Sequence, residues 1–194
     1  MRLKVFSSLK VYQVTEDRDE WEPLYCRCAE TSGMEYVGSL TQPELARESR
    51  SVNILAYPNT FAETSCISVR EALASGCFVV ASNWGYLPET TAGSAPLIPL
   101  SQSNTSNSIP PFSSIPAREF YPLEFLLAIL EVLEVLTGAN PQETEQFLRK
   151  QVDYFNKYCT WRLRALEWEE WLKTINKMSH KISVESLYER ALAM

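Results

Sequence analysis

Two short apolar runs joined by a helical segment constrain the fold of this chain more than any other feature. The first run, Val52–Tyr57, is too short for a helix and is followed by Pro58 and Asn59, which is typical of a buried parallel strand leading into a loop. The second run, Phe78–Ala81, has the same character and predicts the next strand. The sequence therefore predicts a strand–loop–helix–strand unit.

The segment between the two runs has the pattern of an α-helix. Its apolar side chains recur at helical spacing, at Ile67, Val69, Leu73 and Ala74. Thr64 or Ser65 is expected to cap the amino end, because a hydroxyl oxygen there can accept a hydrogen bond from a free backbone N–H. Gly76 is expected to end the helix.

Two acids bracket the beginning of this predicted helix. Glu63 precedes it and Glu71 lies about two turns inside it, so their carboxylates should be on the order of 10 Å apart along the axis. Between them lies the helix amino terminus, where free N–H groups favour an anion. A nucleotide diphosphate sugar suits this layout, because it has hydroxyls at both ends and phosphates in the middle. Two acids alone are more often solvated, and the surrounding pattern is what favours a site.

The same stretch carries a family resemblance. Its motifs are E-x7-E from Glu63 to Glu71, then E-A-L-A-S-G, V-V-A-S, and G-x-x-x-E from Gly85 to Glu89. Together they resemble the donor-binding half of retaining GT-B glycosyltransferases of the large group 1 family. The resemblance covers roughly residues 3 to 172 and is far more specific than a lone glycine pattern.

The resemblance implies roles for ten residues. Glu63 would contact the donor hexose as the catalytic residue, and Glu71 would contact the nucleotide ribose. The remaining donor-binding candidates are Thr64, Ser65, Cys66 and Ile67 for the diphosphate, Gly38 and Ser39 near the base, and Gly85 and Glu89. Two alternatives stay open, because Glu89 either faces the donor or caps the next helical turn, and Gly38 either admits the ligand or only closes a strand with a turn.

The chain departs from the family pattern in several places. Thr64–Ile67 replaces a segment that usually contains glycine, and Phe78 replaces a proline. The chain also opens on a predicted strand, Leu3–Ser7, that corresponds to the second strand of the donor domain. We therefore expect a fragment without the acceptor-binding domain and without the first strand–helix unit, whose Arg and Lys usually neutralise the diphosphate. The isolated chain is expected to be inactive or weakly active.

The predicted fold class is α/β, with a Rossmann-like parallel sheet of about five strands flanked by helices (half of a GT-B fold) and followed by C-terminal helices. Residues 1–100 are predicted to form the nucleotide-sugar-binding domain. Residues 101–117, rich in Ser, Asn and Pro, are predicted to be a flexible linker. Residues 118–175 would supply helices that pack on the domain, and residues 176–194 a tail.

Three further helices have clear signals. A stripe of Trp21, Leu24, Tyr25 and Cys28 predicts that one helix buries these side chains in the core. Thr41 with Glu44 three positions later predicts a capping box and a short helix to about Arg50. A later helix from Thr160 carries Trp161 and Trp168 on one face, which is expected to be partly exposed in this chain.

The amino-acid composition excludes several classes of binding partner. The net charge of −6, without a cluster of Lys and Arg among aromatic residues, argues against nucleic acid. The chain has no apolar run long enough to span a membrane and no signal-peptide pattern. Five scattered cysteines indicate reduced thiols in a cytoplasmic protein. Cys26 and Cys28 lack the further ligands that a metal site needs, so neither a metal nor a cofactor is expected beyond the nucleotide sugar as substrate.

Two functions from different classes follow. The leading hypothesis is the donor-binding domain of a hexosyltransferase, which acts as an enzyme only together with an acceptor-binding domain or partner chain missing from this sequence. The alternative is a non-catalytic fragment that binds a sugar nucleotide or a partner protein. A nicotinamide-dependent dehydrogenase is disfavoured, because no G-x-G-x-x-G follows any predicted strand.

Overall fold

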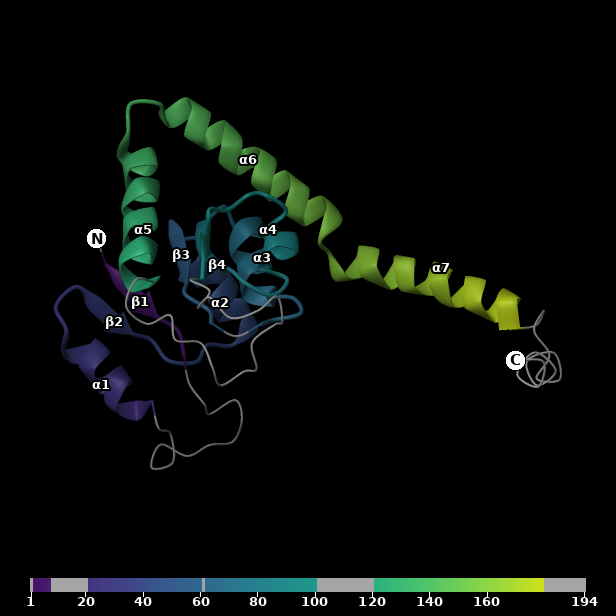
Figure 1. Cartoon of the computed structure of the whole chain (residues 1–194), viewed down its shortest axis with the longest axis horizontal. Coiled ribbons are helices and arrows are strands. Elements are labelled where there is room, and N and C mark those ends of the chain that lie inside the picture. The colour runs from purple at the N-terminus through teal and green to yellow at the C-terminus, as the bar shows by residue number, and fades with distance from the viewer. Residues whose placement is uncertain (1, 8–20, 61, 101–120, 180–194) are drawn as a thin grey trace. The chain divides into compact units, whose positions relative to one another are not determined.

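The computed structural model describes residues 2–7, 21–60, 62–100 and 121–179 (Figure 1). The chain divides into two compact units, Met1–Val52 and Asn53–Met194. The boundary between them lies inside the range 1–100 that the sequence predicts as one domain. The predicted linker, 101–117, lies outside the described residues, and so does the tail from residue 180 onward.

The first unit contains two parallel strands and two helices. In chain order these are β1 (Leu3–Val5), α1 (Glu22–Glu30), β2 (Met34–Tyr36) and α2 (Gln42–Ser49). β1 and β2 pair in parallel along their whole length, with Leu3 opposite Met34. The rings of Tyr25 on α1 and Tyr36 on β2 stack with their centroids 4.7 Å apart, which joins the helix to the strand pair.

The predicted core stripe of α1 is only partly correct. Tyr25 is buried, whereas Trp21 and Leu24 are 48% and 44% exposed. A short helix over a two-stranded pair can cover only the residues that face the strands directly, and the Tyr25–Tyr36 stack occupies that position.

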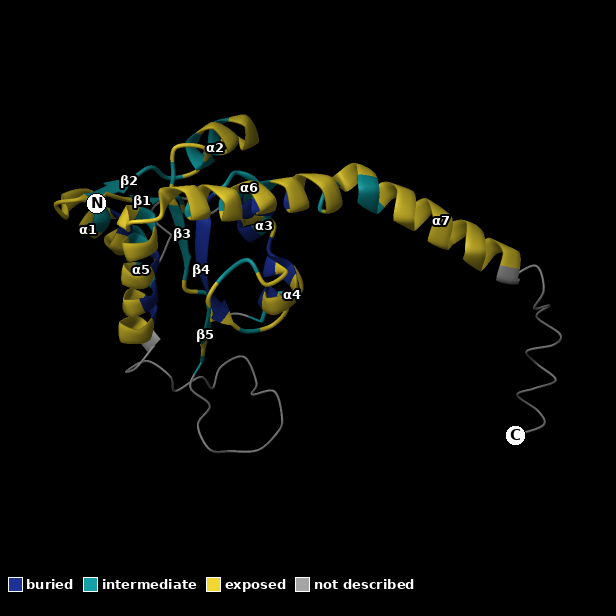
Figure 2. Ribbon diagram, turned by 90° about the horizontal axis from the view of Figure 1, so that it is seen from above, coloured by how far each residue is buried: buried dark blue, intermediate teal, exposed yellow. Residues whose placement is uncertain are grey.

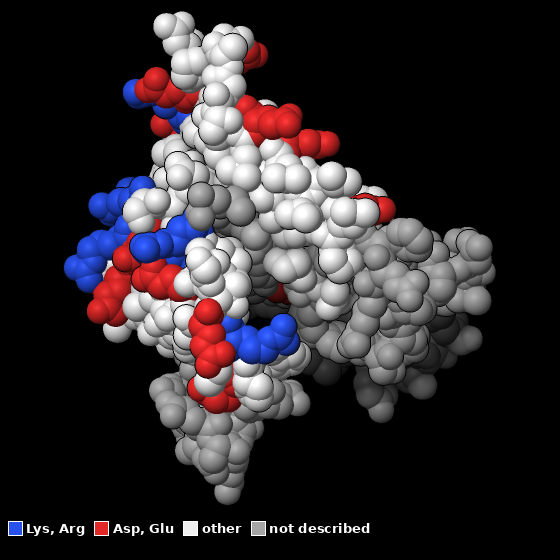
Figure 3. All heavy atoms as spheres, turned by 90° about the vertical axis from the view of Figure 1, so that its left-hand side faces the viewer, with Lys and Arg blue, Asp and Glu red and all other residues white. Residues whose placement is uncertain are grey.

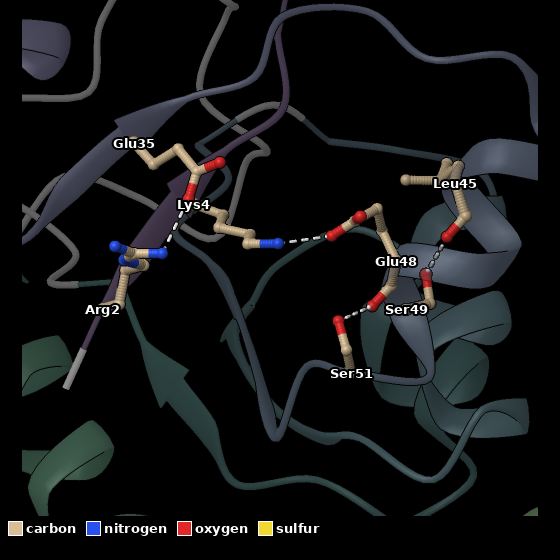
Figure 4. A network of polar contacts seen from close by, with 7 residues as sticks. All are labelled: Arg2, Lys4, Glu35, Leu45, Glu48, Ser49 and Ser51. Atoms are coloured by element: carbon tan, nitrogen blue, oxygen red, sulfur yellow. Dashed lines mark hydrogen bonds and ion pairs between the residues drawn. The ribbon is translucent and has the colours of Figure 1, made fainter.

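The predicted capping box of α2 is confirmed. The Glu44 carboxylate accepts hydrogen bonds from the Thr41 N–H at 2.9 Å and from the Thr41 hydroxyl at 2.6 Å. Charged side chains also join the elements of this unit (Figure 4). Lys4 on β1 donates to Glu48 on α2 at 2.5 Å, and Arg2 lies 3.5 Å from Glu35 on β2. These pairs are solvent-accessible, so they orient α2 and the strands more than they stabilise them.

The second unit is built on a three-stranded parallel sheet of β3 (Ile54–Tyr57), β4 (Phe78–Asn83) and β5 (Leu97–Pro99), in the order β3-β4-β5. The register places Tyr57 opposite Ala81. The mixed α/β class with parallel strands is therefore confirmed. The single sheet of about five strands is not seen in the described residues, because the short strands β1 and β2 form ladder bonds only with each other.

Helices cover both faces of this sheet: α3 (Ile67–Ala74), α4 (Leu87–Thr91), α5 (Tyr121–Thr137) and α6 (Pro141–Tyr158). Phe78 and Val80 of β4 pack against Phe125, Ala128 and Val132 of α5. Side chains alternate along a strand, so Val79 and Ala81, which are also buried, point to the face that α3 and α4 cover. β4 is consequently buried on both faces (Figure 2).

α6 is fastened to the carboxyl end of α3 by two amide side chains. The buried Gln151 donates from Nε2 to the carbonyl oxygens of Leu73 and Cys77, both at 3.0 Å. The exposed Asn156 donates from Nδ2 to the carbonyl oxygen of Ala74 at 2.9 Å. The last carbonyl groups of a helix have no partner within it, so these bonds satisfy acceptors at the end of α3.

The last described helix, α7 (Trp161–Ser179), is exposed around most of its surface (Figure 2). Thr160 caps it, because the Leu163 N–H donates to its hydroxyl at 3.2 Å. Trp161 and Trp168 are 78% and 60% exposed, as the sequence predicts for this face. In the described part of the chain, no helix combines the length and the apolar character that crossing a membrane requires.

Candidate functional site

Glu63 lies in the loop between β3 and α3, and its carboxylate is fixed by two neighbours. Oε1 accepts a hydrogen bond from the Tyr57 hydroxyl and another from Asn59 Nδ2, the latter at 2.9 Å. Tyr57 is the last residue of β3 and Asn59 follows the turn, so the end of the strand determines where this carboxylate points. Two hydrogen bonds to one oxygen hold a half-buried acid in a defined orientation.

The loop after β4 lies directly against the backbone of Glu63. The Tyr86 N–H donates to the Glu63 carbonyl oxygen at 2.9 Å. Gly85 has a φ of 58°, and a Cβ at this position would lie 2.7 Å from the Glu63 carbonyl oxygen. The Ser82 hydroxyl also donates to the Asn59 carbonyl oxygen. Parallel strands end at the same sheet edge, so the loops after β3 and β4 meet there, where ligands collect in open α/β sheets.

The amino end of α3 differs from the prediction. The N-cap is Cys66 rather than Thr64 or Ser65, and no side chain caps the helix. Cys66 is extended, with φ −102° and ψ 109°, so the first helical residue is Ile67 and the two hydroxyls lie too early in the chain to serve as caps. Thr64 and Ser65 are exposed, while Cys66 is buried. The Val69 N–H faces the Cys66 thiol, whereas no side chain caps the N–H groups of Ile67 and Ser68, which leaves these two for an anion.

Burial determines the protonation state of the groups beside Glu63. It raises the pKa of the Tyr57 hydroxyl above its ordinary value, and contacts with Cys66 and Glu63 add to the rise. Tyr57 therefore stays protonated and donates to the carboxylate. Burial also raises the pKa of the Cys66 thiol, although the Tyr57 hydroxyl and the Val69 N–H partly offset the rise. A neutral thiol is a poor nucleophile, so Cys66 packs and does not react.

Glu71 lies in the second turn of α3 and is half-buried. Its carboxylate has no hydrogen-bond or ion-pair partner among the described residues, which leaves it available to a ligand. The neighbouring Arg70 was not singled out from the sequence, and its Nε is buried without a partner in that same set. Tyr57 and Asn59 were also missed as partners of Glu63, although both stand in the Y-P-N segment that precedes it.

The remaining candidates have different surroundings. Glu89 is exposed in the first turn of the five-residue helix α4, where the Ala92 N–H donates to its carbonyl oxygen at 3.1 Å. Gly38 and Ser39 follow β2 and belong to the first unit. The ring of Tyr36 lies 3.8 Å from where a Cβ of Gly38 would be. The structure thus brings Glu63, Cys66 and Gly85 together, and a joint site with Gly38 and Ser39 stays a prediction.

A hollow of about 510 Å³ lies elsewhere in the second unit, where α5 is followed by α6. Its apolar walls are Leu136, Leu148 and Val152, and Glu145, Arg149 and Asp153 also line it. None of the ten residues predicted from the sequence borders this hollow. No pattern in the sequence indicated it, because helix periodicity does not show where two helices separate.

Neither the distribution of charged side chains nor the grouping of metal-binding residues indicates a further site in the described residues. On the face in Figure 3, the described Lys and Arg side chains lie among Asp and Glu rather than forming an extended area of one sign. Within the described ranges, no three or more His, Cys, Asp or Glu residues are grouped so that they could hold a metal ion. Comparison with protein-family models, with curated proteins and with solved structures finds no match to this chain.

Proposed function

We propose that the second unit is the donor-binding domain of a glycosyltransferase, which binds a nucleotide diphosphate sugar for glycosyl transfer to an acceptor hydroxyl. One observation supports this proposal above the others. The Glu63 carboxylate is held by Tyr57 and Asn59 just before a helix whose first two N–H groups no side chain caps. An oriented acid beside free N–H groups suits a ligand with sugar hydroxyls and phosphates.

Each part of the site has a chemical task in this proposal. Glu63 accepts a hydrogen bond from a hydroxyl of the donor sugar, and Glu71 accepts one from the nucleotide ribose. The N–H groups at the amino end of α3, around Cys66 and Ile67, stabilise the negative charge that builds up on the diphosphate as its bond to the sugar breaks. The acceptor oxygen forms the new bond to the sugar and passes its proton to the departing nucleoside diphosphate, and the acceptor is held by another domain or partner chain.

The test is to titrate the chain with UDP, GDP and ADP sugars and to measure binding by isothermal titration calorimetry. At least one nucleotide should bind, and Glu63→Gln should weaken it about tenfold or more, because the variant removes the charge and keeps the shape. Glu124→Gln, an exposed acid in the first turn of α5, is the matched control and should leave the affinity unchanged. If no sugar nucleotide binds, or if Glu63→Gln binds as the parent does, the proposal is wrong.

A second candidate is a domain that binds a sugar nucleotide without transferring the sugar. One observation favours it: no Lys or Arg side chain forms a hydrogen bond or ion pair with Glu63, Cys66 or Gly85 in the described residues. A departing diphosphate needs charge neutralisation, which a cation usually supplies. Binding without release of free nucleotide over several hours, measured by chromatography, would favour this candidate.

The state of the cysteines indicates the cellular compartment that we propose for this protein. None of the five cysteines forms a disulfide: Cys26, Cys28, Cys66, Cys77 and Cys159. Free thiols fit a reducing compartment, and we include the cytoplasm in the proposal on this ground.

A further inference from the structure

The two loops at the sheet edge approach each other closely at Gly85 and Glu63. A Cβ on Gly85 would lie 2.7 Å from the Glu63 carbonyl oxygen, 2.8 Å from its nitrogen and 3.0 Å from the Ala62 carbonyl carbon. All three atoms belong to the backbone, which cannot rotate away as the end of a flexible side chain can. Any side chain at position 85 must therefore move the Glu63 segment.

A hydrogen bond fixes the same contact from the neighbouring residue. The Tyr86 N–H donates to the Glu63 carbonyl oxygen at 2.9 Å, and α4 begins immediately afterwards, at Leu87. The backbone of Glu63 is therefore held by residues 85 and 86, and its carboxylate by Tyr57 and Asn59. Movement of the backbone would break this alignment.

We propose that Gly85 is a positioning residue that sets the place of Glu63, rather than a residue that contacts the donor. This inference rests on the proposed function for its catalytic meaning, although the contact itself does not depend on any ligand. The absence of a side chain at position 85 lets the loop after β4 approach until Tyr86 bonds to Glu63. The distance between the two loops then fixes how far the Glu63 carboxylate reaches toward the amino end of α3.

The chain offers a matched control in Gly93. Gly93 has a φ of 76°, close to the 58° of Gly85, but a Cβ there meets nothing within 4 Å. Gly85→Ala and Gly93→Ala therefore share the strain of a left-handed residue with a side chain. Only Gly85→Ala adds the collision with Glu63.

The test uses the labelling rate of Cys66 to detect a displacement of Glu63. The buried Cys66 thiol lies beside the Glu63 carboxylate and the Tyr57 hydroxyl. Native protein is alkylated with iodoacetamide, and each cysteine is followed by peptide mass mapping. Gly85→Ala should label Cys66 about tenfold faster than the parent, because the displaced loop uncovers it. Gly93→Ala should label Cys66 at the parental rate. Cys77, which is 1% exposed and precedes β4 at the strand end opposite Gly85, should stay unlabelled in all three proteins.

A second variant addresses the case in which Gly85→Ala is too disruptive. Tyr86→Pro removes the N–H that bonds to Glu63 and should also expose Cys66 selectively. Unchanged Cys66 labelling in both variants would overturn the proposal. Equal labelling of Cys66 and Cys77 in both would also overturn it, because Gly85 would then support the whole unit.

Affinity for the sugar nucleotide that the parent binds is the second measurement. Gly85→Ala should lose about tenfold in affinity and Gly93→Ala should not. If the parent binds none of the nucleotides while Cys66 labelling follows the expected pattern, the proposed function fails and the positioning role of Gly85 stands.

Discussion

Replacing Gln151 by Met tests how α6 is attached to the rest of the second unit. The Gln151 side chain is 3% exposed and donates two hydrogen bonds of 3.0 Å, one to the Leu73 carbonyl in the last turn of α3 and one to the Cys77 carbonyl just before β4. Met has nearly the same length and shape but no donor, so the substitution removes both bonds and leaves the packing almost unchanged.

The expected loss follows from these contacts. Two hydrogen bonds contribute about 1 kcal/mol each, or about 2 kcal/mol together. The Gln151 Oε1 is buried without a partner among the described residues, which itself costs about 1 kcal/mol of stability. Removing this atom recovers part of that cost. The free energy of unfolding should therefore fall by about 1 to 2 kcal/mol in urea. For a chain of 194 residues this corresponds to a melting temperature lower by about 2 to 8 °C.

Asn156→Leu is the control for this measurement. Asn156 stands on the same helix and also donates to an α3 carbonyl, the oxygen of Ala74 at 2.9 Å, but it is exposed. Water can replace its bonds, so the free energy of unfolding should change by less than about 0.5 kcal/mol. If Gln151→Met is as stable as Asn156→Leu, the buried amide does not fasten α6 and the reasoning is wrong.

Two further predictions concern the thiols and α7. Burial raises the pKa of Cys77 to about 11 and also raises that of Cys66. In native protein both should therefore resist iodoacetamide from about pH 7 to about pH 9, while the exposed Cys26 is labelled. Peptide mass mapping checks this, and Cys77 labelling in step with Cys26 would contradict it. A chain that ends after Thr160 lacks α7, whose tryptophans bury little, and should lose less than about 1 kcal/mol of unfolding free energy in urea. A larger loss would show that α7 packs against the unit.

Local signals explain which elements the sequence predicted well. α3 ends at Ala74, just before Gly76 with its φ of 86°, as predicted, because glycine adopts this left-handed conformation at little cost. The capping box of α2 was equally predictable, since Thr41 and Glu44 interact within one turn. β3 and β4 were predicted because each is a short apolar run, although only β4 is fully buried and β3 is half-buried.

Elements that depend on distant partners could not be predicted in this way. The helical periodicity predicted α1, but it did not show which of its apolar side chains would be buried. Of the predicted stripe, only Tyr25 is buried, and it stacks on Tyr36. A single sheet of about five strands was expected from the resemblance to half of a GT-B fold, whereas the order of strands depends on ladder bonds between distant segments. The cap of α3 was wrong because Thr64 and Ser65 are good capping residues, while the chain turns only at Cys66.

For the candidate site, the sequence located the acid but not its surroundings. Glu63 was predicted in the loop after β3, where it lies. Its partners Tyr57 and Asn59 escaped notice because residues in an irregular loop have no fixed spacing to guide such a prediction. Gly85 was assigned to the ligand, and only coordinates could reveal its approach to the Glu63 backbone.

The pairing of Tyr57 with Ala81 has a consequence for how this region tolerates changes in length. β3 ends at this pair and β4 continues only to Asn83, so the number of residues between Tyr57 and Glu63, and between Ala81 and Gly85, determines whether the two loops meet. Inserting or deleting one residue in either loop moves its end by about 3.3 Å, which is more than the contact at Gly85 can absorb. Point substitutions can be accommodated on the exposed faces of these loops, whereas insertions and deletions cannot.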